Sequence, residues 1–381
     1  MSSGAVVVQP VASGRELDAF IALPKRLYRG RPAYIAPLDL ERKETLSRRK
    51  NPYFRHAEGE LFLARRNGAV VGRISAQFCR LRQEKYRDDV GHFGWLDTID
   101  DIAVMRALAE AAETWLKTHG AKRMLGPFSF SSNEESGLLV DGFDATPMLM
   151  MPYHLPHQGR LIEACGFRKA MDLLAYTVDK ATYNAVGSNR MLDKVRNDGR
   201  IRLRALDMKN YKADLAELLT VFNDAWSENW EMVPFTQAEI EAAAASMKPL
   251  IDPDLVVIAE IDGEVGGMLV CLPNLLEAVR DLDGRLLPFG FARLLWRLKR
   301  KTLKTARVPL MGIRRKYHGT LTGAALLPLM FHRLKEPFLA RGLEQVELSW
   351  ILEDNGPMRR VLEGIGAKVY KTYRIYEKAI A

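Results

Sequence analysis

A cluster of basic residues and glycines that follows an apolar run near residue 310 could bind phosphate groups. Arg314, Arg315 and Lys316 supply positive charge, and Gly319 and Gly323 let the backbone approach a ligand closely. Backbone N–H groups at the start of the next helix can hold phosphate oxygens, helped by the helix dipole. The residues placed for this backbone contact are His318, Gly319, Thr320 and Gly323. The alternative is an ordinary strand-to-helix turn capped by Thr320.

A second polar region, from Ser129 to Tyr153, could carry proton-transfer chemistry. Glu134 or His154 could act as a base, and Asn133 or Tyr153 could position a polar substrate by hydrogen bonding. Loops that interrupt a rigid scaffold often carry function. A polar loop held by local turn bonds is the alternative.

A third candidate lies in the motif VELSW, where Glu347 and Ser349 alternate along a predicted strand. Residues two apart on a strand point to the same face, so the two side chains are expected to lie together. Glu347 is therefore a further candidate base. Pairing of Glu347 with a basic residue on a neighbouring strand is equally compatible with the pattern.

Positive charge is concentrated in one segment. From Gly284 to Lys335 there is no acidic residue and there are thirteen Lys or Arg, and taking these from the net charge of +9 leaves −4 for the rest. Such a segment indicates an anionic partner. The stretch 284–300 interleaves its basic residues with Leu, Phe and Trp, as helices in a membrane interface do. Docking on its own domain is the alternative. The sequence has no recognised nucleic-acid module, so no nucleic-acid partner is expected.

The composition indicates a protein of ordinary globular type, with 381 residues, enough for two or three domains. No stretch reaches the length of an apolar membrane span, and the N-terminal residues do not resemble a secretory signal. Cys79, Cys165 and Cys271 lie far apart without zinc-like spacing, so we expect neither a disulfide framework nor a metal. A cytoplasmic location follows.

The chain contains an internal repeat with an offset of 200 residues. RLIEACGFRKAMDLLAY, from Arg160, matches RVLEGIGAKVYKTYRIY, from Arg360. Glutamate, glycine and tyrosine recur at equivalent positions, namely Glu163 and Glu363, Gly166 and Gly366, and Tyr176 and Tyr376. Each copy is typical of a short helix, a glycine stop and a strand.

Each half predicts the same order of elements. The order is strand, helix, hairpin, strand, long helix, strand, helix, strand, with Asn67-Gly68 and Asp262-Gly263 as the hairpin turns. This favours an α/β fold (an α+β mixed sheet). We expect domains at 1–180 and 201–381, joined by a linker at 181–200, with a basic insertion at 277–307 in the second half.

The second half resembles the GCN5-related N-acetyltransferase (GNAT) family. VPLMGIRRKYHGTLTGAALLPLMFHRL, from Val308, falls where that family has its fourth strand, Gly-rich loop and long helix, although Lys316 and Leu321 depart from the loop pattern. The resemblance implies an acyl-CoA co-substrate bound at this loop and a cofactor contact at Asn355. The tyrosine that often serves as general acid is replaced by Leu362, and by Ile162 in the first half.

The first half resembles the family less closely. Asp97, Asp100 and Asp101 fill the place where phosphate would sit, and carboxylates there repel a pyrophosphate. We therefore expect the first half to be a degenerate GNAT-like domain that does not bind coenzyme A and has a structural or substrate-shaping role.

The whole chain also resembles the bacterial ceramide synthase group of acyl-CoA N-acyltransferases, through NPYFRHAEGELFLARRNGAVVGRISA, GPFSFSSNEESGLLVDGFDATPMLMMPYH and NWEMVPFT. The resemblance implies transfer of an acyl group from long-chain acyl-CoA to a sphingoid-base amine, giving (dihydro)ceramide on the inner membrane surface, where the protein is expected to be peripheral. An acetyltransferase for a soluble amine or a protein lysine is one alternative. A non-catalytic acyl-CoA sensor is another.

Overall fold

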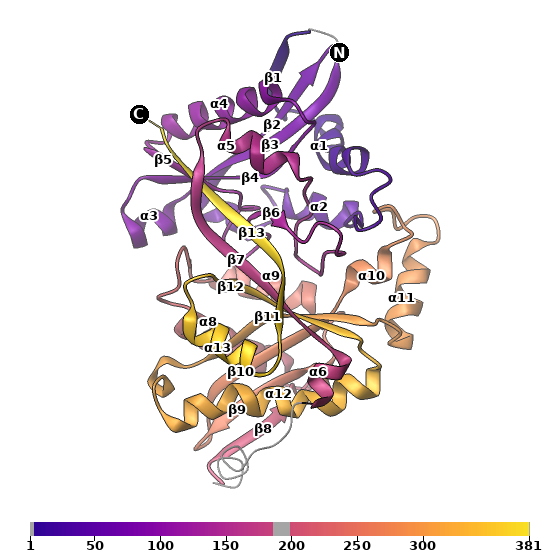
Figure 1. The fold of residues 1–381 in the computed structure, drawn as a ribbon, viewed down its shortest axis with the longest axis vertical. Coiled ribbons are helices and arrows are strands. Elements are labelled where there is room, and N and C mark those ends of the chain that lie inside the picture. Colours follow the sequence, from indigo (N-terminus) through magenta and orange to yellow (C-terminus); the bar gives the residue numbers. More distant parts are fainter. Residues whose placement is uncertain (1–3, 186–198, 381) are drawn as a thin grey trace. The chain divides into compact units, whose positions relative to one another are not determined.

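The computed structural model describes residues 4–185 and 199–380 and divides into two compact units (Figure 1). The first unit contains the chain up to Leu174, together with Val279–Gly290 and the end from Lys371. The second contains Ala175–Ala278 and Phe291–Tyr370. The predicted linker at 181–200 falls mostly outside the described residues.

The first unit has a mixed sheet covered by helices. Its elements are β1 (Val6–Pro10), α1 (Gly14–Leu27), α2 (Asp39–Thr45), η1 (Pro52–Arg55), β2 (Ala57–Arg66), β3 (Ala69–Cys79), α3 (Arg80–Tyr86), β4 (Val90–Thr98), α4 (Ile102–Thr118), β5 (Arg123–Gly126), β6 (Leu138–Asp141), α5 (His157–Glu163) and the first part of β7 (Arg168–Asp179). The strands pair in the order β1-β2-β3-β4-β5, antiparallel except for the parallel pair β4–β5.

Successive side chains of the strands point to opposite faces of the sheet, so the first unit has a hydrophobic core on each face. On β2, Phe62 and Ala64 face the core that contains Leu108 of α4, whereas Leu63 faces the core that contains Phe20 of α1. Because successive strand residues point to opposite faces, α4 and α1 cover the two faces of the same sheet.

The second unit repeats this arrangement. After the end of β7 its elements are α6 (Lys180–Ala185), β8 (Ile201–Ala205), α8 (Tyr211–Ala225), α9 (Gln237–Met247), η2 (Pro253–Leu255), β9 (Val256–Ile261), β10 (Glu264–Pro273), α10 (Leu275–Val279), α11 (Gly290–Arg300), β11 (Thr305–Ile313), η3 (Arg315–Tyr317), α12 (Leu321–Arg341), β12 (Gln345–Leu352), α13 (Gly356–Gly364) and the start of β13 (Lys368–Ala379). Strands β8-β9-β10-β11 pair antiparallel, and β11–β12 pair in parallel. The predicted mixed α/β class and the order of elements in each half are confirmed.

The last strand of each half is exchanged with the other half. The end of β13 pairs antiparallel with β5, and the hydroxyl of Tyr376 donates a hydrogen bond to Glu163 at 3.0 Å. In the second unit the hydroxyl of Tyr176, on β7, donates to Glu363 at 2.8 Å. The tyrosine and glutamate of the sequence repeat therefore bond crosswise between the two halves, once in each unit.

Candidate active site

The parallel strands β11 and β12 of the second unit pair only at their beginnings and then separate. Their ladder joins Thr305–Val308 to Gln345–Leu348, although β11 continues to Ile313 and β12 to Leu352. On its other edge, β11 has one extra residue opposite β10 at this point, which is a β-bulge. Pro309 lies at the bulge, where its missing N–H is tolerated. We call the space between the separated strands the β11–β12 opening.

A buried ion pair lies just before the opening. Arg307 and Glu347 are directly opposite each other in the ladder, and Arg307 Nε is 3.3 Å from Glu347 Oε1. Both side chains are almost fully buried. Glu347 also accepts hydrogen bonds from the Ser349 hydroxyl, at 2.6 Å, and from the Tyr370 hydroxyl. Arg307 Nε donates to Ser349 Oγ at 2.9 Å.

This network gives Glu347 the cross-strand partner that was the alternative interpretation of VELSW. Ser349 shares its face, as the alternation predicts. Arg307 and Tyr370 were missed. A lone basic residue inside the apolar run TARVPLMGI could have indicated Arg307, because a buried charge needs a partner. No sequence signal places Tyr370 beside Glu347, since that depends on where β13 lies.

The predicted phosphate loop forms the N-terminus of helix α12. Gly319 has φ +73°, a conformation that favours glycine, and Thr320 is the helix N-cap, accepting a hydrogen bond from Gly323 N at 3.0 Å. A Cβ on Gly323 would lie 2.0 Å from the Tyr317 carbonyl oxygen, so only glycine fits there. The next N–H groups, of Leu321 and Thr322, have no acceptor within the helix and are available to an anion.

The basic side chains of the loop are paired with acidic neighbours. Arg314 is 2.6 Å from Glu264, and Lys316 pairs with the same carboxylate, which raises the pKa of Lys316 through the hydrogen bond and the opposite charge. Arg315 pairs with Glu228. The His318 ring lies 2.9 Å from the Ile313 carbonyl oxygen. Exposed ion pairs of this kind contribute little energy, so a phosphate can displace them.

Asn355 is the N-cap of α13, and its side chain accepts a hydrogen bond from Met358 N at 3.1 Å. Its observed role is therefore capping. The implied cofactor contact at Asn355 stays a prediction.

The four polar candidates of the first half lie in the first unit. Backbone N–H groups of Asn133 and Glu134 bond within a turn to Ser131, as in the alternative of local turn bonds. The Tyr153 ring packs against Tyr28 at 5.3 Å. His154 is buried, and its Nδ1 accepts a hydrogen bond from Leu139 N at 3.1 Å. Burial lowers the pKa of His154 to about 4, so it is neutral at pH 7.

The corresponding opening in the first unit is filled by the chain itself. Strands β4 and β5 pair at Val90–His92, after which Phe128 N donates a hydrogen bond to Phe93 O at 2.7 Å. A Cβ on Gly94 would lie 1.7 Å from the Phe128 carbonyl oxygen, which shows how closely this segment crosses β4. At the start of α4, the Asp101 carboxylate accepts hydrogen bonds from Ala103 N and Val104 N. Of these two groups, Ala103 N is the counterpart of Thr322 N, which is available to a phosphate in α12, and Val104 N is the counterpart of the capped Gly323 N.

Comparison with known proteins identifies the scaffold. The fold is similar to that of the tandem GNAT protein from the clavulanic acid biosynthesis pathway, with a TM-score of 0.58 and 13% identity over 99% of both chains. It is also similar to a GCN5-related N-acetyltransferase from Sphaerobacter thermophilus, with a TM-score of 0.53 and 14% identity over 98% of this chain and 96% of that one. No protein-family model matches the chain. The chain therefore has the fold of tandem GNAT proteins.

Two proteins that are similar in sequence over almost the whole chain show its family. The chain is 44% identical over 374 residues to the bacterial ceramide synthase of Caulobacter vibrioides, covering 98% of this chain and 97% of the relative. It is 42% identical over 375 residues to the protein YghO of Escherichia coli, covering 98% and 95%. The chain belongs to the family of these proteins. It is an acyl-CoA-dependent N-acyltransferase, with acyl-CoA as co-substrate.

We predict that Gly323→Ala weakens coenzyme A binding at least tenfold, because the new Cβ forces the loop away from Tyr317 O and misplaces the helix N-terminus. Gly364→Ala is the matched control, since a Cβ there has no neighbour within 4 Å. Calorimetric titration of purified protein with coenzyme A measures both. Equal affinity of the two variants would contradict the assignment of this loop.

We predict that His154 makes the folded protein less stable as the pH falls from about 6.5 toward 4. Its pKa is lowered from 6.5 to about 4 in the folded state, so in this range the unfolded chain binds a proton that the folded chain does not. The loss is on the order of 2 kcal/mol at pH 5. Urea unfolding at pH 7 and pH 5 should show a smaller loss for His154→Asn than for the unsubstituted protein. If both proteins lost the same stability between pH 7 and pH 5, His154 would have to bind its proton as readily in the folded chain as in the unfolded chain.

Proposed function

We propose that this protein transfers a long-chain acyl group from acyl-CoA to the primary amine of a sphingoid base, giving (dihydro)ceramide, while bound to the inner membrane surface. The family supports the chemistry, because one relative is named a bacterial ceramide synthase. The observation that supports a lipid acceptor is the exposed surface formed by helix α11 and the residues just before it.

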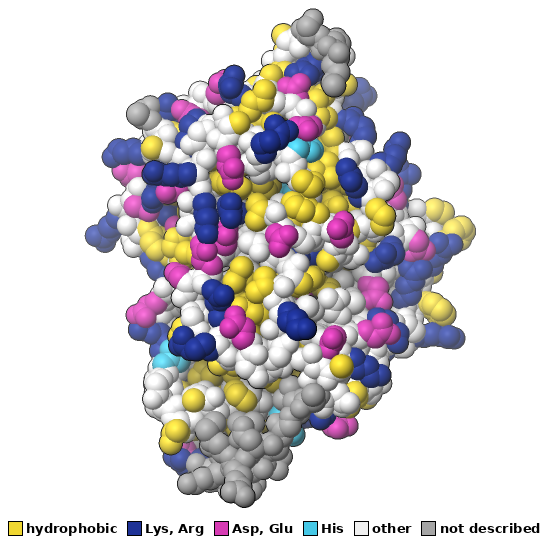
Figure 2. All heavy atoms as spheres, in the orientation of Figure 1, with side chains coloured by type: hydrophobic (Ala, Val, Ile, Leu, Met, Phe, Trp, Pro, Cys, Tyr) yellow, Lys and Arg dark blue, Asp and Glu magenta, His cyan; other side chains and the backbone are white. Residues whose placement is uncertain are grey.

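This surface exposes large apolar side chains among basic ones. In α11, Phe291, Leu295 and Trp296 are 55%, 42% and 53% exposed, and just before the helix Leu287 and Phe289 are 83% and 72% exposed. Figure 2 shows yellow and dark blue side chains together at the right-hand edge, over α11. Apolar side chains flanked by Lys and Arg bind a membrane interface by burial and by attraction to anionic lipid. A soluble acceptor gives no reason for such exposure.

Among the described residues, no helix is both long enough and apolar enough to cross a bilayer. Membrane binding is therefore proposed through the surface of α11 and not through a spanning segment in that part of the chain. The docking of this helix on its own unit is partial, with Leu294 buried and Arg297 Nη1 donating to Ala278 O at 2.6 Å.

In the proposed reaction the acyl-CoA phosphates lie at the N-terminus of α12, and the thioester lies in the β11–β12 opening. The amine nitrogen bonds to the acyl carbon, the C–S bond breaks, and coenzyme A leaves as its thiolate. The proton that the amine loses passes through the Ser349 hydroxyl, which already donates to the carboxylate, to Glu347, and from there can return to the thiolate. Arg307 orients Ser349 through the hydrogen bond from its Nε and lies beside the Glu347 carboxylate. Base or positioning roles for Asn133, Glu134, Tyr153 and His154 stay predictions from the sequence.

Ser349→Ala should lower turnover about a hundredfold or more, while acyl-CoA affinity stays within a few-fold, because only the proton path is broken. Rates at saturating acyl-CoA and a calorimetric titration measure the two quantities. Ser246→Ala, at an exposed serine on α9, is the control. Turnover that survives Ser349→Ala would exclude the relay.

Replacing Phe291, Leu295 and Trp296 together by serine should weaken binding to vesicles containing anionic lipid at least tenfold. Acylation of a sphingoid base presented in those vesicles should fall in parallel, whereas acylation of a short-chain soluble amine should not. Leu40→Ser, at another exposed leucine, is the control. Vesicle sedimentation and mass spectrometry of the N-acyl product give the readouts. Undiminished vesicle binding would count against the membrane proposal.

A further inference from the structure

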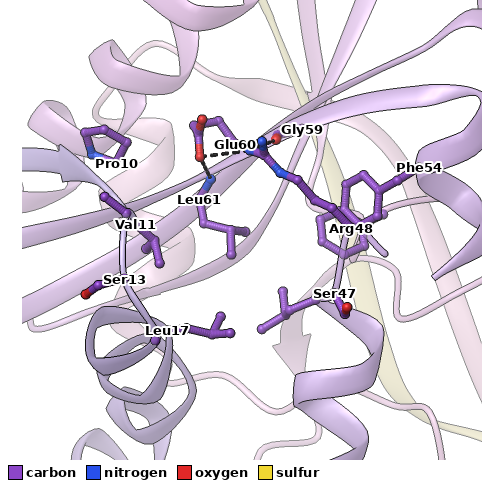
Figure 3. A pocket seen from close by; sticks show the side chains of 14 residues that line it. Pro10, Val11, Ser13, Leu17, Ser47, Arg48, Phe54, Gly59, Glu60 and Leu61 are labelled. Carbon is purple, nitrogen blue, oxygen red and sulfur yellow. Dashed lines mark hydrogen bonds and ion pairs between the residues drawn. The ribbon is translucent and has the colours of Figure 1, made fainter. Parts of the chain in front are cut away.

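The first unit contains a pocket that the acyl-CoA site does not use. It has a volume of about 510 Å³ and lies between the β1–α1 connection, the end of α2 and the start of β2 (Figure 3). Pockets of this size bind single small molecules. Its apolar walls are formed by Val11, Leu17, Leu46, Phe54, Leu61 and Phe130. Leu46 and Phe130 are buried members of the unit's hydrophobic core, so the floor of the pocket is rigid.

Two hydrogen-bond acceptors converge on one cationic nitrogen at the side of this pocket. Arg48 Nη2 donates to the Gly59 carbonyl oxygen at 2.7 Å and to Glu60 Oε1 at 3.2 Å. Figure 3 shows the Arg48 side chain reaching to these two groups. The backbone N–H of Leu61 donates to Glu60 Oε1 at 3.2 Å and so orients the carboxylate. The two acceptors together make a subsite for a positive N–H group.

Arg48 can leave this subsite at little cost. Its side chain is 64% exposed, whereas that of Glu60 is only 25% exposed. An ion pair with one so exposed partner contributes little to stability, and the long side chain loses entropy when it is held. A ligand with its own ammonium group can therefore replace the guanidinium, while its apolar part covers Leu17 and Leu61.

We infer that this pocket binds a primary amine carried on a single long hydrocarbon chain. The inference rests on the proposed function in one respect, because that function supplies a long-chain amine as substrate. An anionic amphiphile fits less well. Among the lining residues Arg48 and Glu60 are the charged ones, and a carboxylate or phosphate on Arg48 would face both Glu60 and the Gly59 carbonyl oxygen. The first half would then bind a long-chain amine at a site of its own, separate from the amine that reacts beside Ser349.

The test measures binding of dodecylamine, dodecanoate and butylamine to the full-length protein by calorimetry, below the micelle concentration of each. Dodecylamine should bind at least tenfold more tightly than either of the others, because it alone has both the charge and the chain. If dodecanoate bound as tightly as dodecylamine, the pocket would not select a positive head group. If butylamine bound as tightly, the pocket would not bind the long hydrocarbon chain.

Substitutions locate the binding. Glu60→Gln should weaken dodecylamine binding about tenfold through loss of the charge. Arg48→Gln should strengthen it several-fold, because the competing guanidinium is gone. Ser47→Trp should block the pocket, and Arg49→Trp, an exposed neighbour outside the lining, should not. Melting curves verify folding. Dodecylamine affinity unchanged in Glu60→Gln and in Arg48→Gln would place the amine elsewhere.

Acyl transfer is assayed separately, so that the two proposals can fail independently. If the substitutions change amine binding as expected but no variant acylates any amine, the pocket assignment stands and the proposed function fails. If the unsubstituted protein acylates a sphingoid base while Glu60→Gln and Ser47→Trp leave dodecylamine binding unchanged, the pocket assignment fails alone.

Discussion

The buried ion pair between Arg307 and Glu347 is the interaction on which the candidate active site depends. Removing two charges from water is costly, and an arrangement like this persists only when each charge has its full set of partners. Ser349 and Tyr370 complete the set for Glu347. The pair thereby fixes the register of β11 against β12 two residues before Pro309, where the strands begin to separate. The position of the opening, where we propose that the thioester binds, follows from that register.

The two halves use one scaffold in two ways. In the second unit the strands stay apart, and the N-terminal N–H groups of α12 remain available to phosphate. In the first unit the segment around Phe128 crosses the equivalent opening, and Asp101 occupies the N–H groups of α4. The exchange of the terminal strands, with Tyr176 bonded to Glu363 and Tyr376 to Glu163, makes each half depend on the other for its last strand. A first half that does not bind coenzyme A, as the sequence predicts, would therefore still be needed for the strand that it supplies.

The order of helices and strands could be predicted from the sequence, because hairpin turns, glycine stops and apolar periodicity are local signals. It also showed that Tyr176 corresponds to Tyr376 and Glu163 to Glu363. It could not show that they bond crosswise, because a repeat identifies equivalent elements and not their partners. Thr320 and Asn355 were placed at helix starts, where both act as caps. Tyr370 could not be predicted, because its place beside Glu347 depends on where β13 lies, whereas Arg307 could have been noticed as a lone charge in an apolar run.

Consumption of thioester by the purified protein is the most direct test of acyl transfer from acyl-CoA to a lipid amine. Release of free thiol would be followed with acetyl-CoA and palmitoyl-CoA, each with no amine, with a soluble short-chain amine, and with a sphingoid base in vesicles. We expect rapid thiol release only when palmitoyl-CoA and the sphingoid base are present together. Thiol release that proceeds as well with acetyl-CoA and the soluble amine would contradict the lipid acceptor. No release with any amine, despite coenzyme A binding, would contradict catalysis at the β11–β12 opening.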